Sequence, residues 1–131
     1  MTTYSQFLSA LAALPVEGVN RRYQTPPLSL NRADLPAQWV QAGDGESAAI
    51  TLDGGQWPLF RAQLIIAVEA LAQSVLFDSY GQAIEMMDNV HTALTQARLA
   101  KSRTVWHISL SSLSVADVEY LAVIAAVEAS G

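Results

Sequence analysis

The chain has 131 residues, of which 51% are hydrophobic and only 15% are charged, and its formal net charge is -5. This length predicts a single domain, residues 1–131, whose core needs no metal or crosslink. The acidic balance argues against specific nucleic-acid binding, and a chain without cysteine excludes disulfides and thiolate chemistry.

The first segment predicts an amphipathic helix over residues 3–14. Its apolar residues have the spacing of one buried helix face: Phe7, Leu8, Leu11 and Leu14. Thr3 is a candidate N-cap, and Pro15 ends the helix because the residue before a proline avoids helical geometry. The N-terminus lacks the charged and apolar blocks of a signal peptide, which favours the cytoplasm.

Short strands and turns are expected next. Residues 19–23 predict a short polar strand, and the adjacent prolines within 25–34 favour an irregular connector. Two further short strands are expected at 38–41 and 48–52, separated by a glycine-rich turn at 42–46. A second turn signal, Asp53-Gly54-Gly55, predicts a hairpin into the strand that follows.

Residues 58–71 are the longest nearly continuous apolar run, and both helix and strand are open for them. The run is too short for a bilayer, which needs about 20 apolar residues. As a strand, one face would be wholly apolar: Phe60, Ala62, Leu64, Ile66, Val68 and Ala70. The other face is polar at both ends, with Arg61, Gln63 and Glu69 among its residues. This pattern favours a strand with one side in a core and the other half-covered.

The second half of the chain predicts a long helix and a final hairpin. A connector at 74–80, with Asp78 or Ser79 as the cap, leads into an amphipathic helix at 79–99. Residues 104–110 alternate as a half-buried strand, and 111–115 are expected to turn the chain. Residues 116–129 fit either helix or strand, but their β-branched and aromatic content favours a strand. The fold class is therefore α+β, a mostly antiparallel sheet packed against the helices at 79–99 and 3–14.

Residues able to carry chemistry are sparse. His91 follows Asp88 by three residues on the predicted helix, and His107 lies in an alternating strand. Neither belongs to a nucleophile motif, and the pair lacks the spacing of a zinc site. The glycine clusters match no phosphate-binding loop. We therefore expect no catalytic, cofactor-binding or metal site, and a protein that is not an enzyme.

The composition favours contacts between chains instead. A small fold with this much apolar sequence has surface to cover, and self-association is the simplest way to cover it. Basic side chains can meet acidic patches on a neighbour, and a tryptophan can anchor a contact. The candidate interface residues are Arg21, Arg22, Trp57, Arg61 and Arg103.

The order of elements resembles the tail terminator proteins of long-tailed bacteriophages, the lambda-type tail-completion family. The likeness covers nearly the whole chain. It includes the N-terminal helix, Leu35-Pro36-Ala37 before a strand ending Trp39-Val40, and the acidic glycine-rich loop 43–46. The long strand through 61–68, one long helix at 79–99 and two closing strands at 105–110 and 118–127 complete it.

This resemblance implies a structural virion protein without cofactors. Such a protein forms a ring, typically a hexamer, that caps the tail tube, stops tube polymerisation and offers a head-attachment surface. Its implied partners are further copies of itself, the tail tube protein and the head–tail connector protein, with no membrane. It would be found in the virion tail and, during assembly, in the host cytoplasm. Alternatives are another head–tail joining protein of the tail or neck, or a small α+β ligand-binding domain or enzyme using His91 or His107.

Overall fold

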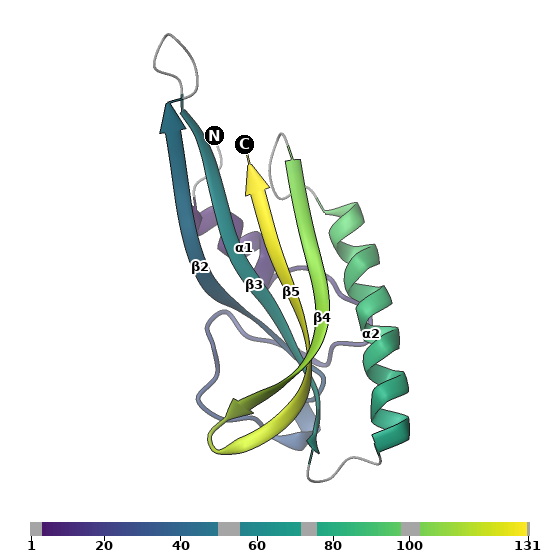
Figure 1. Cartoon of the computed structure of the whole chain (residues 1–131). Helices are drawn as coiled ribbons and strands as arrows, with labels where there is room; N and C mark the ends of the chain where they lie inside the picture. Colours follow the sequence, from purple (N-terminus) through teal and green to yellow (C-terminus); the bar gives the residue numbers. More distant parts are fainter. Residues whose placement is uncertain (1–3, 50–55, 72–75, 98–102, 131) are drawn as a thin grey trace.

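Five strands form one sheet in the computed structural model of this protein, which describes residues 4–49, 56–71, 76–97 and 103–130 (Figure 1). The elements in chain order are α1 (Tyr4–Ala12), β1 (Arg21–Arg22), the 3-10 turn η1 (Arg32–Asp34), β2 (Ala37–Ala49), β3 (Gln56–Ala70), α2 (Leu76–Gln96), β4 (Arg103–Val115) and β5 (Val118–Ser130). The α+β prediction is confirmed, and both ambiguous runs, 58–71 and 116–129, are strands except at Leu71, Ala116 and Asp117.

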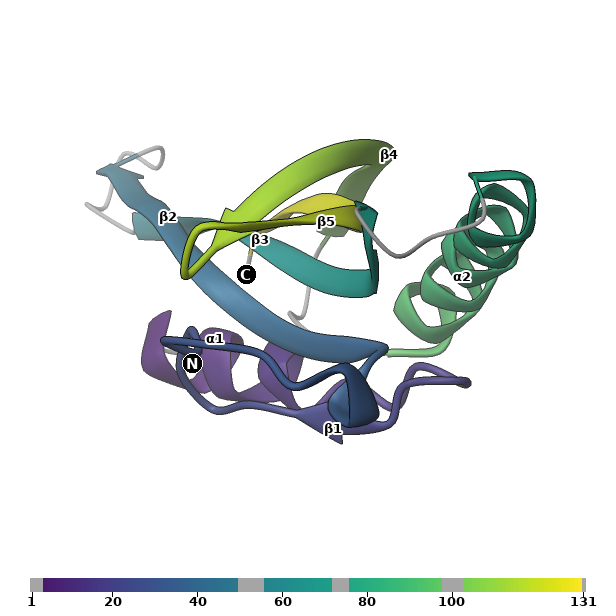
Figure 2. The same ribbon diagram turned by 90° about the horizontal axis from the view of Figure 1, so that it is seen from below.

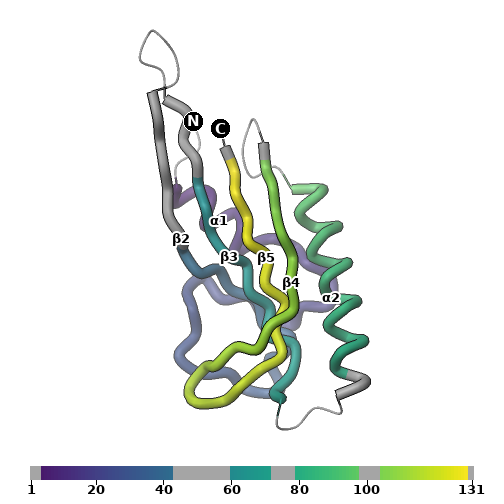
Figure 3. Tube along the Cα trace, viewed as in Figure 1, coloured from purple at the N-terminus to yellow at the C-terminus, as the bar shows by residue number. Residues whose placement is uncertain are grey.

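The strands lie in the order β1-β2-β3-β5-β4. β1 runs parallel to β2, and every other neighbouring pair is antiparallel. After β3 the chain returns along the molecule through α2 before it enters β4, as the trace in Figure 3 shows. The central strands are β3 and β5, so β4 forms one edge of the sheet.

The long strand β3 has the two-sided pattern expected from its sequence. Phe60, Ala62, Leu64, Ile66 and Val68 are buried in the main core. Ala70 was expected on the same face but lies in a second core. Ala67 pairs with Ala122 and Glu69 with Leu121, so Val68 is an extra residue that reverses the alternation.

Two predicted turns are wrong, because the strands continue through them. Ala42 pairs with Ala62 and Gly45 with Phe60, so Gly43 and Asp44 oppose one residue of β3. Gly43 therefore marks a bulge inside β2, because a glycine within a strand often accompanies a bulge. Likewise, residues 111–115 remain in β4, and the reversal falls at Ala116 and Asp117.

The helices follow the predicted apolar faces with shifted boundaries. α1 is confirmed, and Phe7 and Leu11 are fully buried. α2 begins at Leu76, so the expected connector 74–80 is wrong for residues 76–80. No proline or glycine interrupts the sequence between 76 and 80, and Ser79 is buried inside the helix rather than capping it. The expected cap Thr3 and the turn 53–55 lie outside the described residues.

Two cores occupy the two faces of the sheet. The main core lies between the sheet and both helices, and Figure 2 shows α1 below β2. The second core covers the opposite face at one end of the sheet, where residues of the 23–35 segment pack against Trp39, Ile65 and Tyr120. At the other end, this second face has no such cover among the described residues.

Candidate interaction surface

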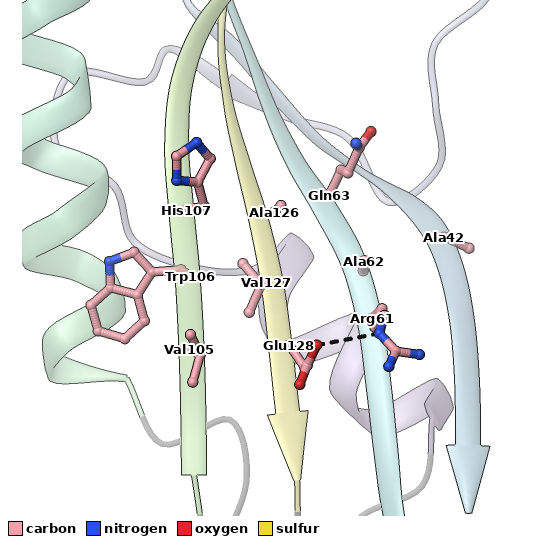
Figure 4. A pocket seen from close by; sticks show the side chains of 10 residues that line it. All are labelled: Ala42, Arg61, Ala62, Gln63, Val105, Trp106, His107, Ala126, Val127 and Glu128. Carbon is pink, nitrogen blue, oxygen red and sulfur yellow. Dashed lines mark hydrogen bonds and ion pairs between the residues drawn. The ribbon is translucent and has the colours of Figure 1, made fainter.

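The uncovered part of the second face is called the bare face here, and six residues define it. Two rows of paired residues cross β3, β5 and β4 at this place. Because paired residues of neighbouring strands point to the same side, their side chains gather there. Figure 4 shows these side chains: Arg61, Gln63, Val105, His107, Ala126 and Glu128. They line a hollow of about 440 Å³ on the sheet.

An ion pair neutralises most of the charge on the bare face. The Nε atom of Arg61 lies 3.3 Å from Oε2 of Glu128, directly across the β3–β5 pairing. The two side chains are 37% and 48% exposed, so water screens the pair and its contribution to stability is small. The bare face is therefore close to neutral, and this ion pair is not required to hold the core together.

The two histidines lie on opposite sides of β4. The Nε1–H group of Trp106 donates a 3.2 Å hydrogen bond to Nδ1 of His91 on α2. His107 follows Trp106 in the strand, so its side chain points to the other face. His91 therefore contacts Trp106 through Nδ1. One site cannot use both imidazoles.

The arginines of β1 have different surroundings. Arg21 is exposed, and its guanidinium carbon lies 5.1 Å above the ring of Tyr23. Arg22 donates hydrogen bonds from Nε to the Leu14 carbonyl at 3.1 Å and from Nη2 to the Val16 carbonyl at 3.0 Å. Arg22 therefore ties the segment after α1 to β1, while Arg21 is available at the surface.

The remaining candidate interface residues do not form one cluster with these arginines. Arg61 belongs to the bare face, whereas Arg21 and Arg22 lie beside β2. Trp57 in β3 pairs with Ala48 of β2, and Arg103 at the start of β4 pairs with Ser130 of β5. The side chains of Trp57 and Arg103 lie outside the described set.

Sequence reasoning did not identify Glu128, Gln63 or Val105 as members of this surface. Glu128 and Ala126 share one face of β5, but nothing in the sequence indicated the register that sets Glu128 opposite Arg61. Register depends on contacts between segments far apart in the chain. The alternation along each strand could have indicated which residues share a face. Only the order of strands in the sheet shows which strands lie next to each other.

The described residues hold no group of three or more histidine and acidic side chains placed to bind a metal ion. Within the same residues, neither helix has the length and apolar character that a membrane crossing requires. Comparison of the sequence with models of known protein families finds no match, and comparison with curated proteins finds no similar chain.

Proposed function

We propose that this protein is a tail terminator of a long-tailed bacteriophage. In this proposal it forms a ring, a hexamer in the family it resembles, at the end of the tail tube. One side of the ring contacts the tube protein and the other offers a surface to the head–tail connector. Tube growth stops because the ring presents no surface on which another tube subunit can add. The mechanism is geometric and breaks no covalent bond.

The observation that carries the proposal is an open five-stranded sheet with a bare, nearly neutral face and one long edge strand, β4. The chain order of one short helix, a long hairpin, one long helix and a closing hairpin agrees with the layout that suggested the family. A low charge content and exposed apolar side chains such as Tyr80, Ile84 and Val105 support repeated contacts between chains.

The test combines solution mass with tube assembly. Light scattering at high protein concentration is expected to give a particle of about six times the 14.1 kDa chain mass. Tail tube subunits of the same virus are then polymerised with and without the protein and imaged by negative stain. We expect shorter tubes that carry a ring at one end. Tubes that grow without limit and never carry the protein would exclude this function.

A second candidate is a small ligand-binding domain, which the hollow beside His107 and Gln63 favours. It predicts chemical-shift changes confined to the bare face when small polar fragments are added, and their loss in His107→Ala. It also predicts a monomer or a twofold dimer in place of a ring. A ring with no fragment binding at the bare face would exclude this candidate.

A further inference from the structure

We propose that copies of this protein join side by side, with β4 of one copy pairing antiparallel with β2 of the next. The sheet then continues across the boundary between chains. This inference rests on the proposed function only for closure into a ring, because the pairing itself follows from the two sides of the sheet.

The first observation is that β4 is a long edge strand without protection. It pairs with β5 from Arg103 to Val115 without a shift of register, and no strand of the described chain pairs with its other side. Each of its side chains from 104 to 115 is exposed or half-buried. Residues 104–115 contain no lysine, arginine, acid, proline or glycine. Monomeric proteins usually blunt such edges with charges, proline or bulges, because open backbone groups recruit another strand.

The second observation is a matching open stretch on β2. Within the described residues, β1 pairs only with Ala37 and Gln38, and the Tyr23 amide adds one bond to the Gln38 carbonyl. From Trp39 to Ala49 no described strand lies on that side of β2. The free stretch of β2 is therefore comparable in length to β4, although the bulge at Gly43 and Asp44 interrupts it.

The strand directions allow these two edges to pair. β2 is antiparallel to β3, β3 to β5, and β5 to β4, so β2 and β4 run in opposite directions within one copy. When two copies stand side by side in the same orientation, β4 of one meets β2 of the next antiparallel. Such a head-to-tail contact uses two different surfaces and can repeat until a ring closes.

Charge on the helices favours this pairing over β4 with β4. α2 packs beside β4, and its described side chains include the acids Glu85 and Asp88 and no lysine or arginine. A twofold β4–β4 pairing would bring two such acidic helices together, which is unfavourable. In the β4–β2 arrangement, α2 instead approaches the α1 side of the next copy, and α1 carries no charged residue.

The α1 side also has a hollow with apolar lining residues that could contact α2 of the neighbouring copy. A hollow of about 480 Å³ lies between α1, residues 24–26 and β2, and Tyr4, Leu8, Pro26 and Val40 are among its lining residues. On α2, Tyr80 is 56% exposed and Ile84 is 39% exposed. Pairing of β4 with β2 would bury apolar surface of α2 on one copy and of the α1 hollow on the next. A β4–β4 pairing would leave the α1 hollow exposed to water.

Cysteine crosslinking tests the pairing cleanly, because the chain has no cysteine of its own. The variants are His107→Cys on β4 and Gln41→Cys on β2, both exposed positions that lie in one row of paired residues across the sheet, with exposed Gln63→Cys on the inner strand β3 as the matched control. Differently tagged chains are co-expressed and treated with a short bis-maleimide. We expect crosslinks between His107→Cys and Gln41→Cys chains, and none above the control when either variant is alone. A chain carrying both substitutions is expected to give a covalent ladder.

Two outcomes overturn the pairing. Efficient crosslinking of His107→Cys to itself would indicate a β4–β4 contact, and a mixture no more crosslinked than Gln63→Cys would indicate that these edges do not meet. Crosslinks without tube capping would remove the proposed function and keep the pairing. Tube capping without crosslinks would do the reverse.

Charged substitutions on the edge give an independent measurement. Val105→Lys with His107→Lys should reduce the assembly to the 14.1 kDa chain without changing the urea midpoint of unfolding. Val118→Lys is the matched control, since Val118 is 41% exposed and Val105 45% exposed, and it lies at the hairpin end of β5. An assembly that survives the two β4 lysines would contradict the pairing.

Discussion

Gln38 is fully buried in β2 and links this strand to the end of α1. Its Nε2 group donates hydrogen bonds to the carbonyls of Ala12 at 3.2 Å and Leu14 at 3.0 Å. Terminal carbonyls of a helix lack partners inside the helix, so a side-chain donor is needed when they are buried. Arg22 also donates to Leu14, which leaves Ala12 more dependent on Gln38.

Gln38→Met should lower the free energy of unfolding by about 1–3 kcal/mol, because the change keeps the side chain's length and removes the buried donor. Urea denaturation followed by circular dichroism measures this. Gln63→Met, at an exposed position, should stay within about 0.5 kcal/mol of the parent protein. Equal stability of both variants would mean that the carbonyls find other donors.

Tyr23 gives a prediction for alkaline pH. Partial burial and the nearby Asp34 carboxylate raise the pKa of the Tyr23 phenol above its usual 10.0, while Arg21 opposes the shift. The folded state holds this proton more tightly than the unfolded chain. Its stabilising effect is therefore complete below pH 10 and is lost as the pH rises through the folded pKa.

Absorbance at 295 nm, compared with Tyr23→Phe, isolates this titration from the other three tyrosines. Arg21→Gln should raise the pKa of Tyr23 further, and Asp34→Asn should lower it without removing the effect of burial. Shifts with the opposite signs would contradict this assignment of causes.

At the scale of elements, the long strands differ most from their sequence signals. Gly43 in β2 and the serines of β4 have turn chemistry, yet both segments remain in strands. Pairing with β3 and β5 stabilises the extended backbone there more than local preference opposes it. The apolar alternation of 58–71 was a dependable signal, because it decides which side chains of the strand are buried on each face of the sheet.

The β4–β5 turn is a place where the sequence is not optimal. Val115 pairs with Val118, so Ala116 and Asp117 form a two-residue loop with φ of 51° and 65°. Such a loop favours asparagine followed by glycine. Ala116→Asn with Asp117→Gly should raise the free energy of unfolding by about 1–2 kcal/mol, because both residues tolerate positive φ.

Urea titration checks this turn, and Ala116→Val is the opposing variant. A β-branched residue is strained at positive φ, so Ala116→Val should lower the urea midpoint. A gain of stability in Ala116→Val would show that the turn adopts another geometry.

For the whole molecule, we expect residues of the bare face to affect assembly and to contribute little to the stability of the fold. The Arg61–Glu128 pair is exposed, so Arg61→Gln should change the free energy of unfolding by less than about 1 kcal/mol. Arg22→Gln should cost about 1–3 kcal/mol, because its guanidinium bonds two carbonyls after α1. If the bare face contacts the tube, Arg61→Gln should also reduce the fraction of capped tubes in negative-stain images. An Arg61→Gln variant that caps tubes normally would remove Arg61 from that contact.

The sequence by itself determined the α+β class, both helices, and the apolar faces of α1 and β3, because each follows from a periodicity of 3.6 or 2 residues within one segment. It did not determine the bulges at Gly43 and Val68, the facing of Arg61 and Glu128, or the separation of His91 from His107. These depend on which strands become neighbours and in what register. Register is decided by packing between residues as far apart as 61 and 128, and only the tertiary structure brings them together.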